Sequence, residues 1–356
     1  MKCLENISRT QIPGDIIMQY IKLYQSIGKN NYNYDTLQRD YDTIVAKTIE
    51  HDTKFFVKYF DTPVTDHRLM MLIERDIAPK NKDEQWVVNV KKAFIKIHRE
   101  SDTFELLTNE IYDLLNFLYK DIVIDQKLQF EKMKKETKKV NLLSSNYVSK
   151  KELLEQLIQA FNKAKNDQHH EVSFIITNFY VDFINMHPFV DKNKEIGLML
   201  LYILLLVNGF EVYEYISMMQ YMYQSKQEFE RAVLSASFNW EEGFSETLSI
   251  HRFLLKVALV SYDALNEMIR NYVYDMGLNK SNNIENTINK LEDVFSKNDL
   301  RKQHPLISDS TIDRTLKRLR DEGKIRPIGQ GRGAKWMKLF ESKHKKVNYA
   351  QIDLKI

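Results

Sequence analysis

Apolar residues recur every three to four positions along most of this chain, which is the spacing of an amphipathic helix. From about Gly14 to Val123 no alternating, strand-like pattern interrupts that spacing. Two apolar stripes in this region predict helix faces that pack into a core rather than ligand sites. They consist of Leu69, Leu72, Ile73 and Ile77, and of Trp86, Val90, Ala93, Phe94 and Ile97.

The middle of the chain contains further predicted helices around one polar break. An apolar stripe between Glu171 and Met186 leads directly to His187. Ile196 to Val207 is apolar on nearly all sides, which predicts a helix surrounded by other helices. Upstream, the lysine-rich segment from Lys127 to Asn146 predicts a surface hairpin or loop, with a solvated connector as the alternative.

Composition narrows the class of protein. The 356 residues allow two or three domains, and 43% hydrophobic with 28% charged residues indicates a globular chain. Cys3 is the only cysteine, so an internal disulfide and a thiolate metal cluster are excluded, which suits a reducing compartment. No signal peptide is visible, and the longest apolar run, Ile196 to Phe210, is too short to span a bilayer comfortably. We therefore expect a cytoplasmic protein without membrane attachment.

The last part of the chain is strongly basic. Asp299 to Lys346 contains 14 basic and 6 acidic residues, a net charge of +8, whereas the whole chain carries +3. The remainder is therefore mildly acidic, at −5. A basic end attached to an acidic body indicates a separate module that binds a polyanion.

The polar break offers groups that suit a nucleotide phosphate chain. They are the imidazole of His187, the carboxylate of Asp191, the carboxamide of Asn193 and backbone N–H groups at a helix start. Unpaired N–H groups at a helix N-terminus bind anions, and an aspartate beside a diphosphate can hold Mg²⁺. His187 could accept a proton from a hydroxyl, and Phe189 would anchor the loop. The alternative is a turn in which Asp191 caps the next helix and His187 is a core histidine.

This loop resembles the signature of the Fic (filamentation induced by cAMP) family, His-x-Phe-x-Asp/Glu-Gly-Asn-Gly/Lys-Arg-x-x-Arg. The chain matches the signature at His187, Phe189, Asp191 and Asn193, and Lys194 matches the variant of the death-on-curing branch. A very apolar helix on each side of the loop agrees with the resemblance.

The resemblance implies a reaction, cofactors and a partner. His187 would be the general base that deprotonates a protein hydroxyl, Asp191 would hold Mg²⁺, and AMP would move from ATP to a Ser, Thr or Tyr. The lysine-rich segment from Lys134 to Leu143 would be a β-hairpin flap that pairs with the target protein as an added strand. The nucleotide-binding residues would be Phe189, Lys192, Asn193, Lys194 and Glu195.

Two positions depart from the signature. Glu195 stands where the family has its first arginine, and Leu198 where the second would be. Those arginines clamp phosphates, and Glu195 could itself occupy the helix N–H groups. Lys192 or Lys194 could restore positive charge, although as a point charge rather than a bidentate fork. An altered donor or a loss of catalysis therefore stays open.

Many Fic proteins carry an inhibitory glutamate that pairs with the second arginine. Glu74 lies at a plausible place for this residue, but the neighbouring residues of the family's inhibitory motif are missing. Because Leu198 offers no arginine, we expect Glu74 to be an ordinary surface glutamate.

From Ile284 to Phe340 the pattern predicts three helices and a two-stranded hairpin, with Trp336 in the hairpin core. The third helix should begin near Ser308 and end at Gly323, which suits the left-handed C-cap position. This order resembles a winged helix, which places its third helix in the DNA major groove. A unit that contacts only proteins is the alternative. The predicted DNA-binding residues are Ser310, Thr311, Arg314, Lys317, Arg318 and Arg332, with Arg314 and Lys317 at base edges.

We therefore predict a mainly α protein with four regions. They are an N-terminal helical region (1–120), a Fic-type helical bundle with its hairpin flap (121–278), a winged helix-turn-helix (279–342) and a basic tail (343–356). The first predicted function is transfer of AMP, or of another phosphate-containing group, to a protein hydroxyl. The alternative is a catalytically inactive Fic protein that regulates transcription by binding double-stranded DNA. A homodimer is left open.

Overall fold

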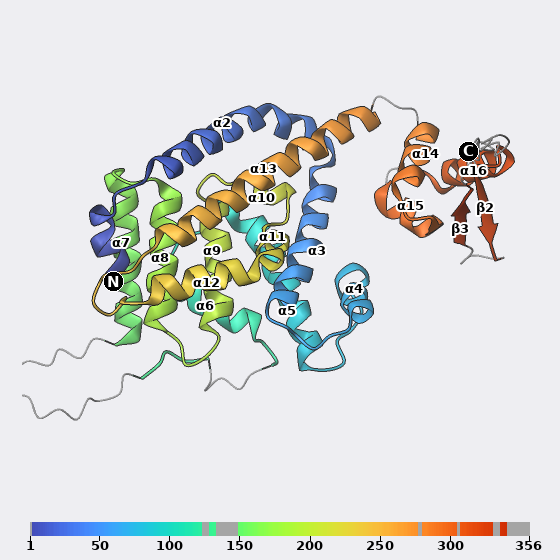
Figure 1. Cartoon of the computed structure of the whole chain (residues 1–356). Coiled ribbons are helices and arrows are strands. Elements are labelled where there is room, and N and C mark those ends of the chain that lie inside the picture. The colour runs from blue at the N-terminus through green and yellow to red at the C-terminus, as the bar shows by residue number, and fades with distance from the viewer. Residues whose placement is uncertain are drawn as a thin grey trace, which may run out of the picture. The chain divides into compact units, whose positions relative to one another are not determined.

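The computed structural model describes residues 2–122, 128–132, 149–276, 280–304, 307–329 and 335–339. Helices dominate this part of the chain and its strands form one small sheet, which confirms the mainly α fold. The chain divides into two compact units, residues 1–267 and residues 268–356 (Figure 1). Within the described residues, no helix combines the length and the apolar character that a membrane span requires.

The larger unit opens with a series of helices that follows the predicted periodicity. The stripe residues of both predicted helices are buried, except that Ile77 is only half-buried because its helix ends at Arg75. The helices are α1 (Lys2–Asn6), α2 (Gly14–Leu37), α3 (Tyr41–Tyr59), α4 (Asp66–Arg75), α5 (Lys82–Glu100) and α6 (Thr108–Leu118), with 3₁₀ turns at Ile7–Arg9, Gln38–Asp40 and Ser101–Thr103.

The second part of this unit surrounds one buried helix. Helices α7, α8 and α9 lie side by side, and α2 runs along α13, to which an Arg252–Asp15 ion pair of 2.7 Å joins it (Figure 1). The bounds are α7 (Lys150–Asp167), α8 (Val172–Met186), α9 (Asn193–Leu206), α10 (Val212–Tyr215), α11 (Met218–Gln224), α12 (Lys226–Ser237) and α13 (Leu248–Met276).

Helix α9 is buried at every position from Ile196 to Leu206, so the prediction of a helix surrounded by other helices is confirmed. It packs closely on α8 at Gly197, where an added Cβ would lie 2.5 Å from Cδ1 of Ile184. Glycine permits this approach because it has no side chain. The loop between α8 and α9 therefore connects two closely packed, buried helices.

The smaller unit contains α14 (Lys280–Lys290), β1 (Val294–Ser296), α15 (Lys297–Gln303), α16 (Asp309–Asp321), β2 (Ile325–Ile328) and β3 (Lys335–Lys338). The sequence pattern predicts only two of these strands, because β1 is too short to produce an alternation of its own. It pairs with β3, so the antiparallel sheet has the order β1-β3-β2.

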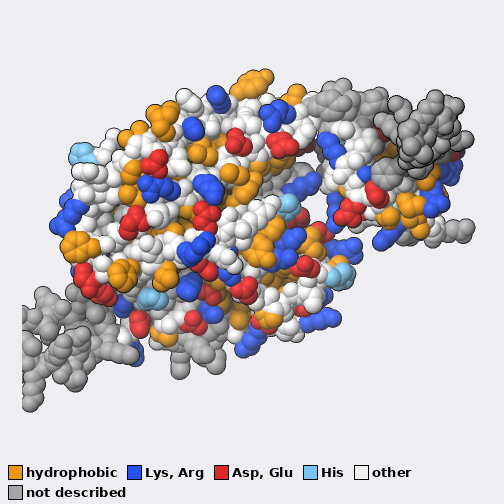
Figure 2. Space-filling model, in the orientation of Figure 1, with side chains coloured by type: hydrophobic (Ala, Val, Ile, Leu, Met, Phe, Trp, Pro, Cys, Tyr) orange, Lys and Arg blue, Asp and Glu red, His pale blue; other side chains and the backbone are white. Residues whose placement is uncertain are grey.

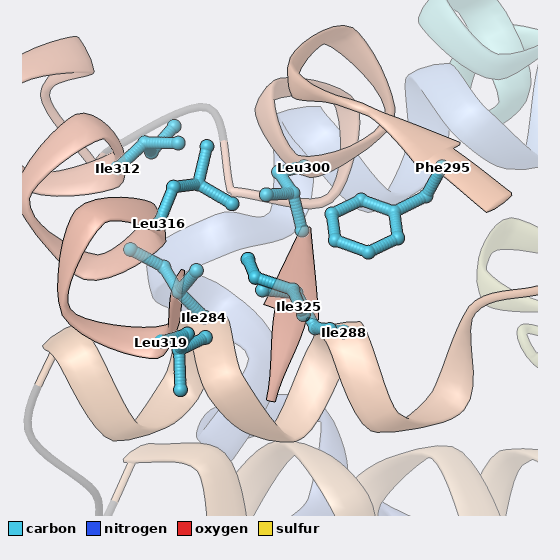
Figure 3. Packing of buried hydrophobic residues seen from close by; sticks show 8 residues of the cluster. All are labelled: Ile284, Ile288, Phe295, Leu300, Ile312, Leu316, Leu319 and Ile325. Atoms are coloured by element: carbon cyan, nitrogen blue, oxygen red, sulfur yellow. The ribbon is translucent and has the colours of Figure 1, made fainter. Parts of the chain in front are cut away.

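Apolar side chains from all of these elements form the core of the smaller unit (Figure 3). Trp336 packs against this core, as predicted. Gly323 follows α16 at φ +71°, which confirms its place at the C-terminal end of the third helix. The buried residues are Ile284, Ile288, Phe295, Leu300, Ile312, Leu316, Leu319 and Ile325.

Candidate functional site

The predicted site lies in the loop between α8 and α9. His187 follows the last residue of α8 at φ 46°, in the left-handed region, and its side chain is exposed. Phe189 is buried and anchors the loop, whereas Asp191 is exposed again. His187 is therefore not a core histidine, and solvent reaches both the imidazole and the carboxylate.

Asn193 holds the loop in shape. Its Oδ1 accepts a hydrogen bond from the N–H of Phe189 at 3.0 Å, and its Nδ2 donates to the carbonyl of Phe189 at 2.7 Å. A carboxamide can donate and accept at once, which an ionised carboxylate cannot do. The loop backbone thus engages both polar ends of this buried side chain.

A short extended segment lies against the loop. Two backbone hydrogen bonds, 2.9 and 3.0 Å long, join residues 129–131 to residues 188–190. The pairing is antiparallel and centred on Phe130 and Phe189, whose ring centroids are 5.1 Å apart. The predicted flap, Lys134 to Leu143, lies entirely outside the described residues.

The first turn of α9 has no side-chain cap. Lys192 precedes the helix at φ 68°, a left-handed conformation that explains the glycine of the family signature at this place. Asp191 does not cap α9, because its Oδ1 accepts the N–H of Lys192 itself at 2.7 Å. Unpaired N–H groups at the start of a 14-residue helix form a site suited to an anion.

Glu195 does not occupy these N–H groups, contrary to one expectation from the sequence. Its carboxylate lies 3.5 Å from Nζ of Lys192, and its charge acts on the hydroxyl of Tyr119. Burial, together with the charge of Glu195, raises the pKa of Tyr119, so that hydroxyl stays protonated. Nζ of Lys192 also lies 3.8 Å from Asp191 and 5.3 Å from the ring centroid of Tyr119.

The remaining departures from the signature have a clear structural setting. Leu198 is a core residue, only 1% exposed, and its side chain offers no polar group to the loop. Lys194 is exposed, and in the described part of the chain it forms no ion pair. Glu74 lies on α4, which packs on α3 and α5, and its charge acts on His51.

Two residues beside the loop were missed by reasoning from the sequence. Lys150, the first residue of α7, donates from Nζ to the carbonyl of Met186 and lies 3.7 Å from the carboxylate of Glu131. A lysine in the first turn of a helix opposes that helix's dipole, and this was the available signal. Tyr119 had none, because it contacts Glu195 only through the tertiary fold.

The site fits magnesium only together with a phosphate ligand. Among the described residues, no three His, Cys, Asp or Glu side chains form a group that could hold a metal ion alone. Asp191 offers one carboxylate, 55% exposed, and Mg²⁺ is commonly held by one or two carboxylates plus phosphate oxygens. The residues present therefore match a magnesium ion that arrives with a nucleotide.

In the smaller unit, the predicted DNA-binding residues separate into groups. Ser310, Arg314 and Lys317 are exposed along α16, whereas Thr311 is half-buried. Arg318 is engaged in ion pairs within the unit. Arg332 lies outside the described residues.

Comparisons with known proteins bear on the loop and the helices around it. Residues 92–205 match the Fic/DOC family. A Fic family protein from Desulfovibrio desulfuricans G20 has a similar structure, with a TM-score of 0.54 and 13% identity over 93% of this chain and 97% of that chain. Fic-1 from C. elegans has a TM-score of 0.54 and 12% identity over 72% of this chain and 74% of that chain. A Fic domain containing signaling protein from Bacteroides thetaiotaomicron VPI-5482 has a TM-score of 0.51 and 13% identity over 69% of this chain and 98% of that chain.

No curated protein matches this chain in sequence. The identities to the solved structures show a shared fold and no more. The family match covers the chain from within α5 to the end of α9 and therefore includes the whole loop from His187 to Glu195. The family match thus places a Fic/DOC domain at residues 92–205, and the solved structures show a shared fold; the Fic family is known for transferring nucleotides to proteins.

Proposed function

We propose that the Fic domain transfers a phosphate-containing group, AMP from ATP in the family's usual reaction, to a hydroxyl of a target protein. The observation that carries this proposal is the uncapped first turn of α9, which lies in the same loop as the exposed His187 and Asp191. N–H groups that remain free at the start of a helix are donors that an anionic phosphate can occupy.

The side chains of the loop have complementary roles in such a transfer. His187 would accept the proton of the target hydroxyl, since its exposed imidazole can be approached by a hydroxyl from solvent. The N–H groups from Asn193 to Glu195 would hold the transferred phosphate. Asp191 would hold Mg²⁺, which would stabilise the charge that develops on the phosphate oxygens.

The missing arginines predict slow transfer. In phosphoryl transfer an arginine at the phosphates is worth roughly 10³ to 10⁵ in rate. Leu198 replaces one arginine with a core residue, and Glu195 is turned toward Tyr119 and Lys192. Lys194, which is exposed at the second position of α9, is then the cation best placed to support a phosphate.

Transfer is tested by incubating the full chain with Mg²⁺, cell lysate and ATP labelled at the α-phosphate. Labelled protein should appear, and His187→Ala should reduce the label by roughly 10² to 10⁴, the usual contribution of a general base. His67→Ala is the matched control, because His67 is an exposed histidine on α4 and should leave the label unchanged. Absence of label from ATP, GTP, CTP and UTP alike would refute transfer from a nucleoside triphosphate.

A second function, binding of double-stranded DNA, is favoured by the smaller unit. Its order of helices and strands corresponds to that of a winged helix, and α16 carries exposed basic side chains. On the visible face of the larger unit, by contrast, acidic and basic side chains are interspersed (Figure 2). A chain that lacked transferase activity would then act through DNA.

A further inference from the structure

The exposed face of α16 is defined by its core. Ile312, Leu316 and Leu319 are buried, so residues 310, 314, 317 and 321 lie along the outer side at helical spacing. Arg314 and Lys317 are one turn apart on that side. Arg314 uses only its Nε–H, which donates to the carbonyl of Ser310 at 3.3 Å. Within the described residues neither side chain forms an ion pair.

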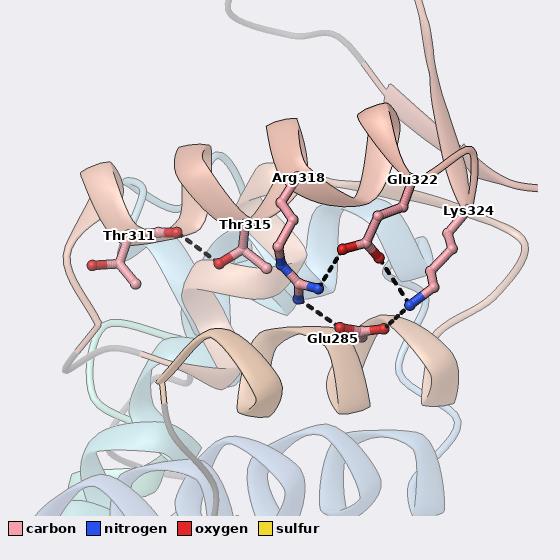
Figure 4. Close-up of polar contacts among 6 residues, drawn as sticks. All are labelled: Glu285, Thr311, Thr315, Arg318, Glu322 and Lys324. Carbon is pink, nitrogen blue, oxygen red and sulfur yellow. Dashed lines mark hydrogen bonds and ion pairs between the residues drawn. The ribbon is translucent and has the colours of Figure 1, made fainter.

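A different flank of α16 faces α14, and its charges are used there. Arg318 donates to Glu285 at 2.6 Å and to Glu322 at 2.8 Å. Lys324 lies 2.6 Å from Glu285 and 2.9 Å from Glu322. Figure 4 shows these side chains converging on Glu285 from α16 and from the residues that follow it. The four residues, here called the Glu285 cluster, have no net formal charge.

The hairpin carries its own exposed cations. Ile325 is buried and Trp336 packs on the core, so these two residues face inward. Residues 326 and 328 lie on the same side of β2, and Lys335 of β3 pairs with Ile328. Arg326 and Lys335 therefore share the outer face of the hairpin. Both are exposed, and in the described chain neither forms an ion pair.

We infer that double-stranded DNA contacts the smaller unit through Arg314, Lys317, Arg326 and Lys335, whereas Arg318 and Lys324 hold α16 against α14 and make no contact with it. The inference rests on the DNA-binding function proposed above. A helix of 13 residues with Arg314 and Lys317 on its outer side fits the major groove, which is about 12 Å wide. Arg314 and Lys317 enter the groove, and the hairpin cations meet the phosphate backbone.

Ion pairs in the Glu285 cluster determine which cations are free to contact DNA phosphates. Binding to DNA releases about 0.9 counterions for each phosphate that a cation neutralises, so the slope of log K against log salt counts the contacts. A cation that already has a carboxylate partner would have to lose that ion pair first. The two phosphate contacts, from Arg326 and Lys335, should therefore contribute about −1.8 to the slope.

The inference is tested with the full chain and a labelled duplex of about 20 base pairs, by fluorescence anisotropy between roughly 50 and 200 mM salt. Arg326→Gln and Lys335→Gln should each weaken binding and make the slope shallower by about one, because each loses a phosphate contact. Arg314→Gln and Lys317→Gln should weaken binding with little change in the slope. Lys324→Gln removes the same charge from a side chain that is 54% exposed, and it should leave the slope unchanged. Arg318→Gln should do the same, with thermal unfolding as the check that the unit remains folded.

The outcomes separate the two levels of the argument. If Lys324→Gln makes the slope as shallow as Arg326→Gln does, the assignment of the surface is overturned while DNA binding stands. If the wild-type chain does not bind duplex at the lowest salt, the proposed DNA function itself fails. Tighter binding to a single-stranded RNA of the same length would overturn double-stranded DNA as the partner.

Discussion

Replacing Asp52 with asparagine should remove a pH dependence from the stability of the larger unit. Asp52 on α3 is fully buried, and its carboxylate accepts hydrogen bonds from Ser217 Oγ at 2.7 Å, the Met219 N–H at 3.0 Å and the Tyr202 hydroxyl at 3.1 Å. Desolvation by burial outweighs these hydrogen bonds and raises the pKa of Asp52 to about 7. These contacts join α3 to α9 and to the start of α11.

The sign and the size of the effect follow from this pKa. The ordinary value is 3.8, so between pH 3.8 and about 7 the folded chain keeps a proton that the unfolded chain releases. The stabilisation that this proton contributes is therefore fully present below pH 3.8 and is lost as the pH rises to about 7. At 1.36 kcal/mol for each pKa unit, the total loss is about 4 kcal/mol.

Asparagine preserves much of this network without a charge. Its Oδ1 can still accept from Ser217 and Met219, and Tyr202 can donate to Nε2 of His98, which lies 2.8 Å from its hydroxyl. Burial lowers the pKa of His98 to about 4, so this histidine is neutral above pH 5 and able to accept. The variant should therefore fold.

The assay is urea unfolding followed by circular dichroism at pH 5, 6, 7 and 8. The free energy of unfolding of Asp52→Asn, relative to wild type, should increase by about 2 to 3 kcal/mol from pH 5 to pH 7 and then level off. Contributions of the histidines cancel in this difference because both proteins contain them. A difference that stays constant from pH 5 to pH 8 would show that Asp52 does not bind a proton near neutral pH.

Four further substitutions test the packing at two glycines and the backbone conformation at Lys192. Gly197→Ala should destabilise the chain by about 1 kcal/mol, because the new Cβ meets Ile184 at 2.5 Å. Gly28→Ala, within α2, has nothing within 4 Å of the added Cβ and should instead stabilise the chain by about 0.5 to 1 kcal/mol. If thermal unfolding ranked these two variants in the opposite order, the packing argument would be contradicted. Lys192→Gly should be more stable than Lys192→Ala by about 1 kcal/mol in urea unfolding, because the residue has φ 68°. Equal stabilities would show that the left-handed conformation costs nothing.

Sequence by itself determined the helical class, the buried stripes and the place of the site. These follow from short-range physics: apolar spacing identifies the face of a helix, and a polar run between two apolar helices must lie in a connection. The C-terminal end of the third helix in the smaller unit was readable at Gly323 for the same reason, since a left-handed residue favours glycine.

Only the tertiary structure decided what the charged side chains do. Glu195 lies 3.5 Å from Lys192 and acts on Tyr119, which is far away in the sequence, and Arg318 pairs with Glu285 on α14. Neither set of contacts could be read from the sequence. Strand β1 exists because β3 offers it hydrogen bonds, which no local pattern records. A long polar side chain can reach several partners at similar cost, and the fold selects among them by bringing one within range.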